Sequence, residues 1–261
     1  MGPEAVKLIP VMSRAKRRPF ELMEELNISL EANGLQLADG DVLVISGKYL
    51  AMAEGRFVDL TKVVPLDDAR EYASRFGMSG GLAETVLRES DFVLRGLQGF
   101  LLTIKDGFFA PNAGVDKSNI PKGEAILHPS HSSRLAASIR REVLVAFGVR
   151  VGVVITDSRL QPLRRGTVGI SIGFSGFDAV VDDRGRKDLF GNRLKVTRRA
   201  VADNLACAAE LLMGESDERV PVVIARSTGL RLSDTDSFDI SVPPDECIFV
   251  RGLSDYWKPR A

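Results

Sequence analysis

The sequence predicts an α+β fold, that is, a mixed α/β protein whose strands, hairpins and helices alternate irregularly. Two observations lead to this prediction. The chain has 261 residues, of which 44% are hydrophobic, and this is ample for a packed core of one large or two small domains. The predicted elements also lack the regular strand–helix–strand order of a doubly wound sheet. We therefore predict a single domain over residues 1–261, with a soft crossing between two lobes near residues 111–133.

The first half of the chain carries three predicted helices, one buried strand and one hairpin. In residues 19–30, apolar side chains gather on one helical face and acids on the other, which indicates an amphipathic helix. Turn residues at 39–41 are followed by an uninterrupted apolar run, which is typical of a buried strand. The predicted elements are helices over 19–30, 67–76 and 81–90, a strand over 42–45, and a hairpin of residues 100–104 and 108–110 around the turn at 105–107.

The second half begins with the strongest helix signal in the sequence. Leu135, Ile139 and Val143 recur on one face, and Gly148 stands where a helix would stop. A buried strand follows and ends in Thr156, Asp157 and Ser158. The predicted elements are helices over 133–147 and 201–212, strands over 151–155, 221–225 and 247–250, a glycine-rich stretch over 163–180, and a polar loop over 227–246.

Charge and composition exclude several classes of function. Lys plus Arg and Asp plus Glu both number 35, so the protein has no overall basic field for nucleic acid or an anionic membrane. Two cysteines, Cys207 and Cys247, are too few for a disulfide framework or a thiolate zinc site, and two histidines, His128 and His131, exclude a His-rich site. No apolar run is long enough for a membrane span, and the first ten residues do not resemble a signal peptide. We expect a cytoplasmic protein whose metal ligands, if any, are oxygens.

Three acidic residues stand out by their context. Asp116 lies in a polar segment, Asp157 directly follows a buried strand, and Glu215 follows the predicted helix stop at Gly214. A carboxylate at the carboxyl end of a buried strand usually faces a crevice where ligands bind. Carboxylate and hydroxyl oxygens suit Mg²⁺ or Mn²⁺, especially when phosphates complete the coordination. For any one of these acids alone, a cap of a turn or helix is the more common role.

Two groups of basic residues are candidates for contact with anions. Arg164 and Arg165 lie between Asp157 and the glycine-rich stretch, where we expect the backbone to approach a ligand closely. Arg184, Arg186 and Lys187 follow further along. The alternative for each group is an ordinary solvated charged face.

The familiar nucleotide and nucleophile motifs are absent. The sequence contains neither a Walker lysine loop nor a GxGxxG fingerprint. No serine stands in a GxSxG setting, so a Ser/His/Asp triad with His128 or His131 is disfavoured, and both histidines are expected in loops. Cys207 falls on the apolar side of a predicted helix, which favours a core role over a nucleophile.

The order of these segments resembles a known family, the coenzyme F420:L-glutamate ligases, also called F420-0 gamma-glutamyl ligases. Each motif is weak alone, whereas their shared order and spacing over residues 38–226 is specific. The flavin domain that is fused to some bacterial relatives is not expected here. The motifs are residues 40–46 (GDVLVIS), 53–56 (AEGR), 112–119 (NAGVDKSN), 153–158 (VVITDS), 164–166 (RRG), 185–191 (GRKDLFG) and 211–215 (LLMGE).

The resemblance implies a GTP- and divalent-metal-dependent amide ligase with the family's two-lobed fold, which forms intertwined homodimers. Such an enzyme adds L-glutamate to the carboxylate of a deazaflavin phosphodiester, a precursor of coenzyme F420, through an acyl phosphate. By the same resemblance, Mg²⁺ or Mn²⁺ is held by Asp116, Asp157, Ser158 and Glu215. The residues that border GTP are Ser46, Gly47, Lys48, Asn119, Met213, Gly214, Glu215 and Ser216, and phosphoryl charge is neutralised by Arg164 and Arg165.

Two departures from the family pattern leave alternatives open. The loop at residues 12–18 is strongly basic and has no glycine, and Met52 stands where the family often carries a nucleotide-contacting Lys. Lys48, four residues earlier, would share a face with position 52 if the segment were extended. The alternatives are a paralogous ligase with a different nucleotide, acceptor or amine, and a non-catalytic nucleotide-binding relative. Nucleic-acid binding through residues 14–18 is disfavoured, because no aromatic residues interleave with the basic ones.

Overall fold

The computed structural model describes residues 5–234 and 240–256 of the chain. Its centre is a five-stranded sheet in the order β1-β12-β2-β8-β9. Within this sheet β2 and β8 pair in parallel, and the other neighbours pair antiparallel. This mixed sheet is consistent with the predicted α+β class. The five strands are β1 (Lys7–Val11), β2 (Val42–Ser46), β8 (Gly152–Leu160), β9 (Thr167–Ser175) and β12 (Val222–Arg226).

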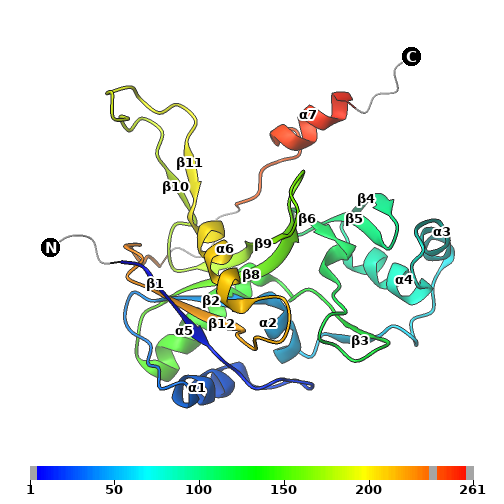
Figure 1. Ribbon diagram of the computed structural model, residues 1–261, viewed down its shortest axis with the longest axis horizontal. Helices are drawn as coiled ribbons and strands as arrows, with labels where there is room; N and C mark the ends of the chain where they lie inside the picture. Colours follow the sequence, from blue (N-terminus) through cyan, green and yellow to red (C-terminus); the bar gives the residue numbers. More distant parts are fainter. Residues whose placement is uncertain (1–4, 235–239, 257–261) are drawn as a thin grey trace.

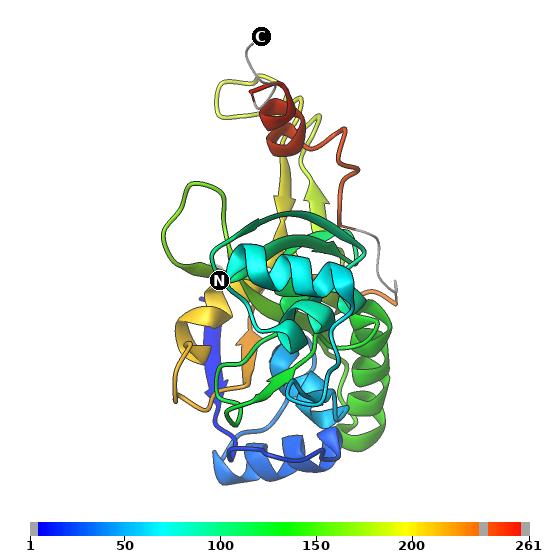
Figure 2. The ribbon, with the colours of Figure 1, turned by 90° about the vertical axis from the view of Figure 1, so that its right-hand side faces the viewer.

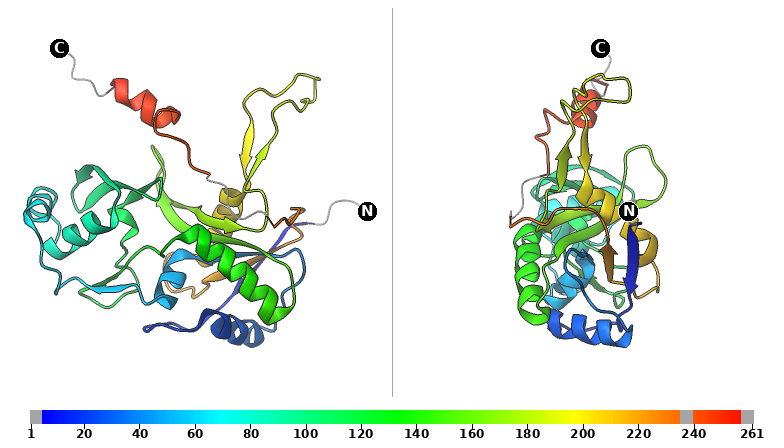
Figure 3. Two further views of the ribbon diagram at one scale, coloured as in Figure 1. Left: turned by 180° about the vertical axis from the view of Figure 1, so that it is seen from behind. Right: turned by 90° about the vertical axis from the view of Figure 1, so that its left-hand side faces the viewer.

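Helices cover both faces of the central sheet. Helices α1 (Leu22–Ala32) and α5 (Ser132–Phe147) lie on one face, seen from behind in Figure 3, and α6 (Val201–Met213) lies on the other face, seen in Figure 1. Alternate residues of a strand point to opposite faces. Accordingly, Leu43 and Ile45 of β2 join the core beneath α1 and α5, whereas Val42 and Val44 join the core beneath α6.

The glycine-rich stretch forms strand β9, and its glycines serve helix packing. A Cβ at Gly169 would lie 2.4 Å from the carbonyl oxygen of Ala206 in α6, and one at Gly173 would lie 2.6 Å from the backbone of Ser132 in α5. The expectation that the glycines leave room for a ligand is therefore wrong at Gly169, where α6 fills the space. Because these two positions have no side chain, α6 packs closely on one face of β9 and α5 packs closely on the other.

The buried face of α6 does not include Cys207. Ala202, Leu205, Ala206, Ala209 and Met213 are buried against the sheet. Cys207 is exposed, so its predicted core position is wrong. The small alanines next to Gly169 allow the closest approach, and this rotates Cys207 to the outer face.

A smaller layer packs at one end of the sheet, and Figure 2 looks onto it. Both predicted helices and the predicted hairpin of this region are confirmed. Leu82 and Val86 of the second helix bury against Leu101 of the hairpin. The elements are α3 (Asp67–Phe76), α4 (Gly80–Glu89), the sheet of β4 (Phe92–Leu97), β5 (Phe100–Lys105) and β6 (Phe108–Pro111), the 3₁₀ turn η1 (Asn112–Gly114), and the pair of β3 (Phe57–Asp59) and β7 (Glu124–Ile126).

Two segments extend away from the body on the same side (Figure 1): the β-ribbon of β10 (Val180–Asp182) and β11 (Arg198–Ala200), and helix α7 (Ile248–Tyr256). The strand predicted at 247–250 is wrong, because these residues begin α7. A short apolar run does not by itself distinguish a strand from a helix. Of the predicted loop at 227–246, residues 235–239 lie outside the described residues. None of the described helices is long and apolar enough to cross a membrane.

Candidate functional site

A cleft of about 730 Å³ opens beside the ends of β2 and α6, and we call it the main cleft. It collects side chains from segments that are far apart in the sequence. Its walls are residues of the loop 13–17 after β1, of the junction between β2 and helix α2 (Gly47–Ala53) from Ser46 to Met52, of the segment 116–121, of β8 at 156–158, and of the end of α6 with its following loop at 210–221.

Asp116 lies at one wall of the cleft and pairs with a lysine. Its carboxylate accepts hydrogen bonds from the backbone N–H and the hydroxyl of Ser118, and Lys48 Nζ lies 2.5 Å from Oδ2. Burial raises the pKa of Asp116, but the Lys48 charge and these hydrogen bonds outweigh burial, so the pKa is lowered. The carboxylate is therefore ionised at neutral pH and is available as an oxygen ligand.

Asp157 lies within β8 rather than at its end, which corrects the sequence prediction. Strand β8 continues to Leu160 after a bulge between Ile155 and Thr156, while its parallel pairing with β2 ends at Thr156. The extra residue of the bulge is Ile172 of β9, since Ile155 pairs with Gly173 and Thr156 pairs with Ser171. Asp157 and Ser158 follow the last residue of β8 that pairs with β2, and both line the cleft there.

A buried arginine holds Asp157. The Arg159 side chain is only 4% exposed, and its Nε donates to Asp157 Oδ2 at 2.7 Å. The same guanidinium contacts the carbonyl oxygen of Phe109 and lies 3.2 Å from Nε2 of His128. Burial lowers the pKa of His128, so its neutral imidazole accepts through Nε2. This network fixes the Asp157 carboxylate in one orientation.

Two carboxyl groups meet at the end of α6. Glu215 Oε1 accepts a hydrogen bond from the Thr167 hydroxyl at 2.6 Å. Glu210 also lines the cleft, and burial, together with its hydrogen bond and repulsion from Glu215, raises the pKa of Glu210 to about 8. Glu210 is therefore mostly protonated at neutral pH and can share its proton with Glu215.

The other wall joins two predicted nucleotide-binding segments. Asn119 Nδ2 donates to the Ser216 carbonyl oxygen at 2.8 Å, and Ser216 N–H donates to Glu218. Gly214 has a φ of 64°, which suits glycine and turns the chain back toward the cleft. The segments 112–119 and 213–220, separated by almost a hundred residues, thus border one space.

Lys48 and Met52 both line the cleft because they lie on helix α2 (Gly47–Ala53). The extended geometry considered from the sequence is wrong here, although the two residues do share a face, at positions i and i+4 of a helix. Gly47 begins this helix in a tight space, since a Cβ there would lie 3.2 Å from the Thr156 carbonyl oxygen.

The basic loop after β1 also faces the main cleft. Lys16 is paired with Glu25 of α1, and the Ser13 hydroxyl donates to the same carboxylate. Arg14 and Arg17 are exposed and form no ion pair with any residue that the structure describes. These two guanidinium groups, together with that of Arg219, thus border a cleft whose wall also carries the acids Asp116, Asp157, Glu210, Glu215 and Asp217.

The donor set of the cleft fits a hard divalent cation in its chemistry. Asp116, Asp157, Ser158 and Glu215 offer carboxylate and hydroxyl oxygens, which Mg²⁺ and Mn²⁺ prefer. Among the described residues, no three His, Cys, Asp or Glu side chains are already grouped as a metal site. Lys48 and Arg159 instead satisfy the two aspartates.

Comparison with known proteins connects this cleft to one family. Residues 17–227 match the family described as F420-0:Gamma-glutamyl ligase. The chain belongs to this family. It is 39% identical to the coenzyme F420:L-glutamate ligase of Methanocaldococcus jannaschii, over 88% of this chain and 92% of that protein. It is also 39% identical to the protein of the same name from Methanopyrus kandleri, over 86% and 88%, and 40% identical to that from Archaeoglobus fulgidus, over 80% and 84%.

Membership of the F420-0:gamma-glutamyl ligase family confirms the resemblance and the prediction of an enzyme that forms amide bonds, since the relatives are named as ligases. The matched range includes Asp116, Asp157 and Glu215 of the cleft. It begins at residue 17, so most of the basic loop precedes it.

The structure does not bring every predicted residue to the cleft. Arg164 and Arg165 lie in the exposed turn between β8 and β9 and are not part of the cleft wall. Arg184 pairs with Asp182, and Arg186 pairs with Asp183, on the β10–β11 ribbon. These arginines belong to surface segments of the ligase.

Sequence reasoning missed Arg159, Glu210 and His128. Arg159 stands two residues after Asp157, and such spacing in a strand gave the only signal that the two side chains share a face. Glu210 is an acid inside an otherwise apolar helical stretch. His128 gave no local signal, because its partner lies 31 residues away in the sequence.

Proposed function

We propose that this chain is a coenzyme F420:L-glutamate ligase that uses GTP and a divalent metal. The observation that supports this most is the convergence of Asp116, Asp157 and Glu215 on one cleft that is also bordered by the predicted nucleotide segments. Its relatives carry that ligase name over most of both chains. Three separated carboxylates beside free guanidinium groups suit a site where phosphates and a metal ion meet.

A carboxylate does not react directly with an amine, so the reaction needs activation. In the proposed sequence, a carboxylate oxygen of the deazaflavin phosphodiester attacks the γ-phosphorus of GTP, and GDP leaves. The amino group of L-glutamate then attacks the acyl carbon, loses a proton, and expels inorganic phosphate. A bound Mg²⁺ or Mn²⁺ supplies charge neutralisation for the phosphates. No covalent nucleophile from the protein is needed.

The residues of this chain have separate tasks in the proposal. Asp116, Asp157, Ser158 and Glu215 hold the metal, and Arg159 keeps Asp157 oriented toward it. Lys48, Arg14 and Arg17 face the phosphates. Ser46, Gly47, Asn119 and the residues from Met213 to Ser216 border the nucleotide. Arg164 and Arg165 reach the substrates only if the chain or a second subunit moves them there, and we assign them no catalytic task.

We also propose that the ligase is a homodimer. The tip of the β10–β11 ribbon exposes 99% of Leu189 and 89% of Phe190, and α7 exposes Ile248 and Phe249. Large apolar side chains on projecting arms usually cover a partner surface. Both arms extend to the same side of the body, as Figure 1 shows, so a second copy would meet them together.

The test of the ligase is phosphate release with both substrates. Purified protein with Mg²⁺ or Mn²⁺ should release phosphate from GTP only when the deazaflavin precursor and L-glutamate are both present. The product should gain the mass of one glutamyl residue. Absence of turnover with either GTP or ATP and either metal would refute the proposal.

One alternative has specific support. Met52 and the basic loop distinguish this cleft from the family pattern, so a different nucleotide or amine is the second candidate. A screen of nucleoside triphosphates and amino acids separates the two candidates. Preference for GTP and L-glutamate over all other pairs rejects the alternative.

A further inference from the structure

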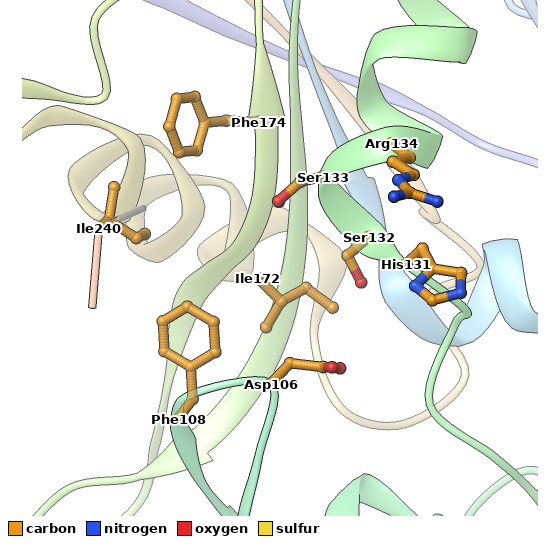
Figure 4. A pocket seen from close by; sticks show the side chains of 10 residues that line it. Asp106, Phe108, His131, Ser132, Ser133, Arg134, Ile172, Phe174 and Ile240 are labelled. Atoms are coloured by element: carbon orange, nitrogen blue, oxygen red, sulfur yellow. The ribbon is translucent and has the colours of Figure 1, made fainter. Parts of the chain in front are cut away.

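A second cavity, of about 410 Å³, lies at the start of helix α5, and we call it the α5 cavity. Figure 4 shows it from close by. Its walls come from the β5–β6 turn, the first turn of α5, strand β9 and Ile240. It has no lining residue in common with the main cleft.

The first turn of α5 gives one end of the cavity a positive character. The helix has 16 residues, and its first N–H groups have no partners within the helix. The N-cap residue, His131, makes no capping hydrogen bond with its side chain, and the first turn contains no acid. Arg134 also lines the cavity and forms no ion pair with a described residue. This end of the cavity therefore favours an anion.

Ser132 supplies a second and independent indication. It is 6% exposed, and its Oγ is buried without a hydrogen-bond partner among the described residues. Figure 4 shows this hydroxyl pointing into the space between Ile172, His131 and Asp106. Buried hydroxyls are nearly always hydrogen-bonded, so an unpaired one at a cavity wall is a group that a ligand bound there can satisfy.

The position of Ser132 is enforced by its neighbours. A Cβ at Gly173 would lie 2.6 Å from the Ser132 backbone, so only glycine lets β9 support the helix start this closely. The backbone of Ser132 therefore cannot move toward β9, and the start of α5 is fixed at this wall of the cavity. The hydroxyl is held where a ligand would meet both it and the first N–H groups of the helix.

The rest of the cavity wall is mostly apolar. Aromatic and branched side chains of Phe108, Phe174, Ile172 and Ile240 face the cavity in Figure 4. Asp106 is the one carboxylate among the described lining residues, and it lies across from the helix end. A ligand with a ring or alkyl body and one anionic end fits this distribution, and its anion would point away from Asp106.

We propose that the α5 cavity is a second ligand site, which binds a small organic anion, a carboxylate or a phosphate monoester, on an aromatic or apolar body. The anionic group accepts hydrogen bonds from the Ser132 hydroxyl and the first N–H groups of α5, with Arg134 adding charge. The body packs against Phe108, Ile172 and Phe174. The site does not depend on the ligase reaction, since it uses no residue of the main cleft.

The test measures the binding of two simple probes, benzoate and phenyl phosphate, to the full chain by calorimetry or ligand-detected NMR. Both probes should bind with a Kd near or below about 1 mM. Saturating GDP with Mn²⁺, if it binds, should leave the affinity for the probe unchanged. Competition would place the probe in the main cleft and overturn the proposal. The stronger probe identifies carboxylate or phosphate as the preferred anion. Failure of both probes to bind at about 10 mM also overturns it.

Variants separate a ligand site from a structural role. Ser132→Ala should weaken probe binding about tenfold, because a hydrogen bond to a charged group is lost, while the protein remains as stable as before. Asp106→Asn should strengthen binding about two- to fivefold, because a repelling charge is removed. Ser138→Ala, the same change on the same helix away from its start, should have no effect on binding. Unchanged affinity in the Ser132→Ala variant refutes the proposal, whether or not the ligase is active.

Discussion

Asp157→Asn tests the proposed metal site most directly. The variant keeps the size of the side chain and retains one oxygen to accept the hydrogen bond from Arg159 Nε, but it removes the negative charge. If Asp157 holds a divalent cation, that charge is essential. We expect GTP-dependent ligation to fall at least about 1,000-fold, the scale seen when a main source of charge stabilisation is removed from a transition state.

The cost in stability follows from the burial of Arg159. Breaking a fully buried ion pair costs about 3–5 kcal/mol. The Asp157 side chain is 29% exposed, and Arg159 retains its contacts with the Phe109 carbonyl oxygen and His128. Asn also keeps one acceptor. We therefore expect a loss of only about 1–2 kcal/mol in the free energy of unfolding, which leaves the variant folded.

The assay compares phosphate release with urea unfolding, for this variant and a matched control. Asp203→Asn makes the same change in a carboxylate that accepts from the Ser171 N–H and lies outside the main cleft, so it should leave activity nearly unchanged. An Asp157→Asn enzyme that is folded and retains a tenth or more of wild-type activity would refute a metal role for Asp157. An unfolded one would indicate that the Arg159 pair is chiefly structural.

Three further outcomes follow from the structure. Glu210→Gln should stabilise the protein at about pH 9 more than at about pH 6. The pKa of Glu210 is raised to about 8 in the folded protein, so wild-type stability falls as the pH rises from the ordinary pKa of a glutamate to about 8; urea unfolding at both pH values measures this. Phe190→Asp should shift the proposed dimer toward monomer in sedimentation equilibrium, whereas a solvated ribbon tip predicts no shift. Gly169→Ala should cost about 2 kcal/mol or more, because its Cβ would meet the Ala206 carbonyl oxygen; thermal unfolding unchanged from wild type would contradict that packing.

The elements that could be predicted from the sequence are those with long, regular patterns. The apolar runs of β2 and β8 and the periodic face of α5 appear where the sequence places them. The three-residue strands β3, β7, β10 and β11 have no such pattern, because their partners, not their own residues, define them. Strand β1 contains Pro10 and lies at the edge of the sheet, where a missing N–H is tolerated.

The candidate site was predictable only in part, for a geometric reason. Asp116 stands out by its polar segment, Asp157 by the buried apolar run before it and Glu215 by the helix stop at Gly214, and all three line the main cleft. Arg164 and Arg165 are close to Asp157 in the sequence. Strand β8, however, extends beyond the cleft to Leu160 before the chain turns. Distance along an extended strand grows by about 3.3 Å per residue, so the step from Asp157 to Leu160 already leads the chain away from the site, and Arg164 and Arg165 lie in the turn that follows.

The pairing of the basic residues around the cleft links the two departures from the family pattern, which are Met52 and the basic loop at residues 12–18. Lys48 is engaged by Asp116, Arg159 is buried against Asp157, and Lys16 is held by Glu25. Each of these charges is already compensated by a carboxylate. Met52 adds none, so the uncompensated charge at the cleft wall comes from Arg14 and Arg17 of the basic loop and from Arg219. We infer that the basic loop and Arg219 supply the phosphate-directed charge of this cleft.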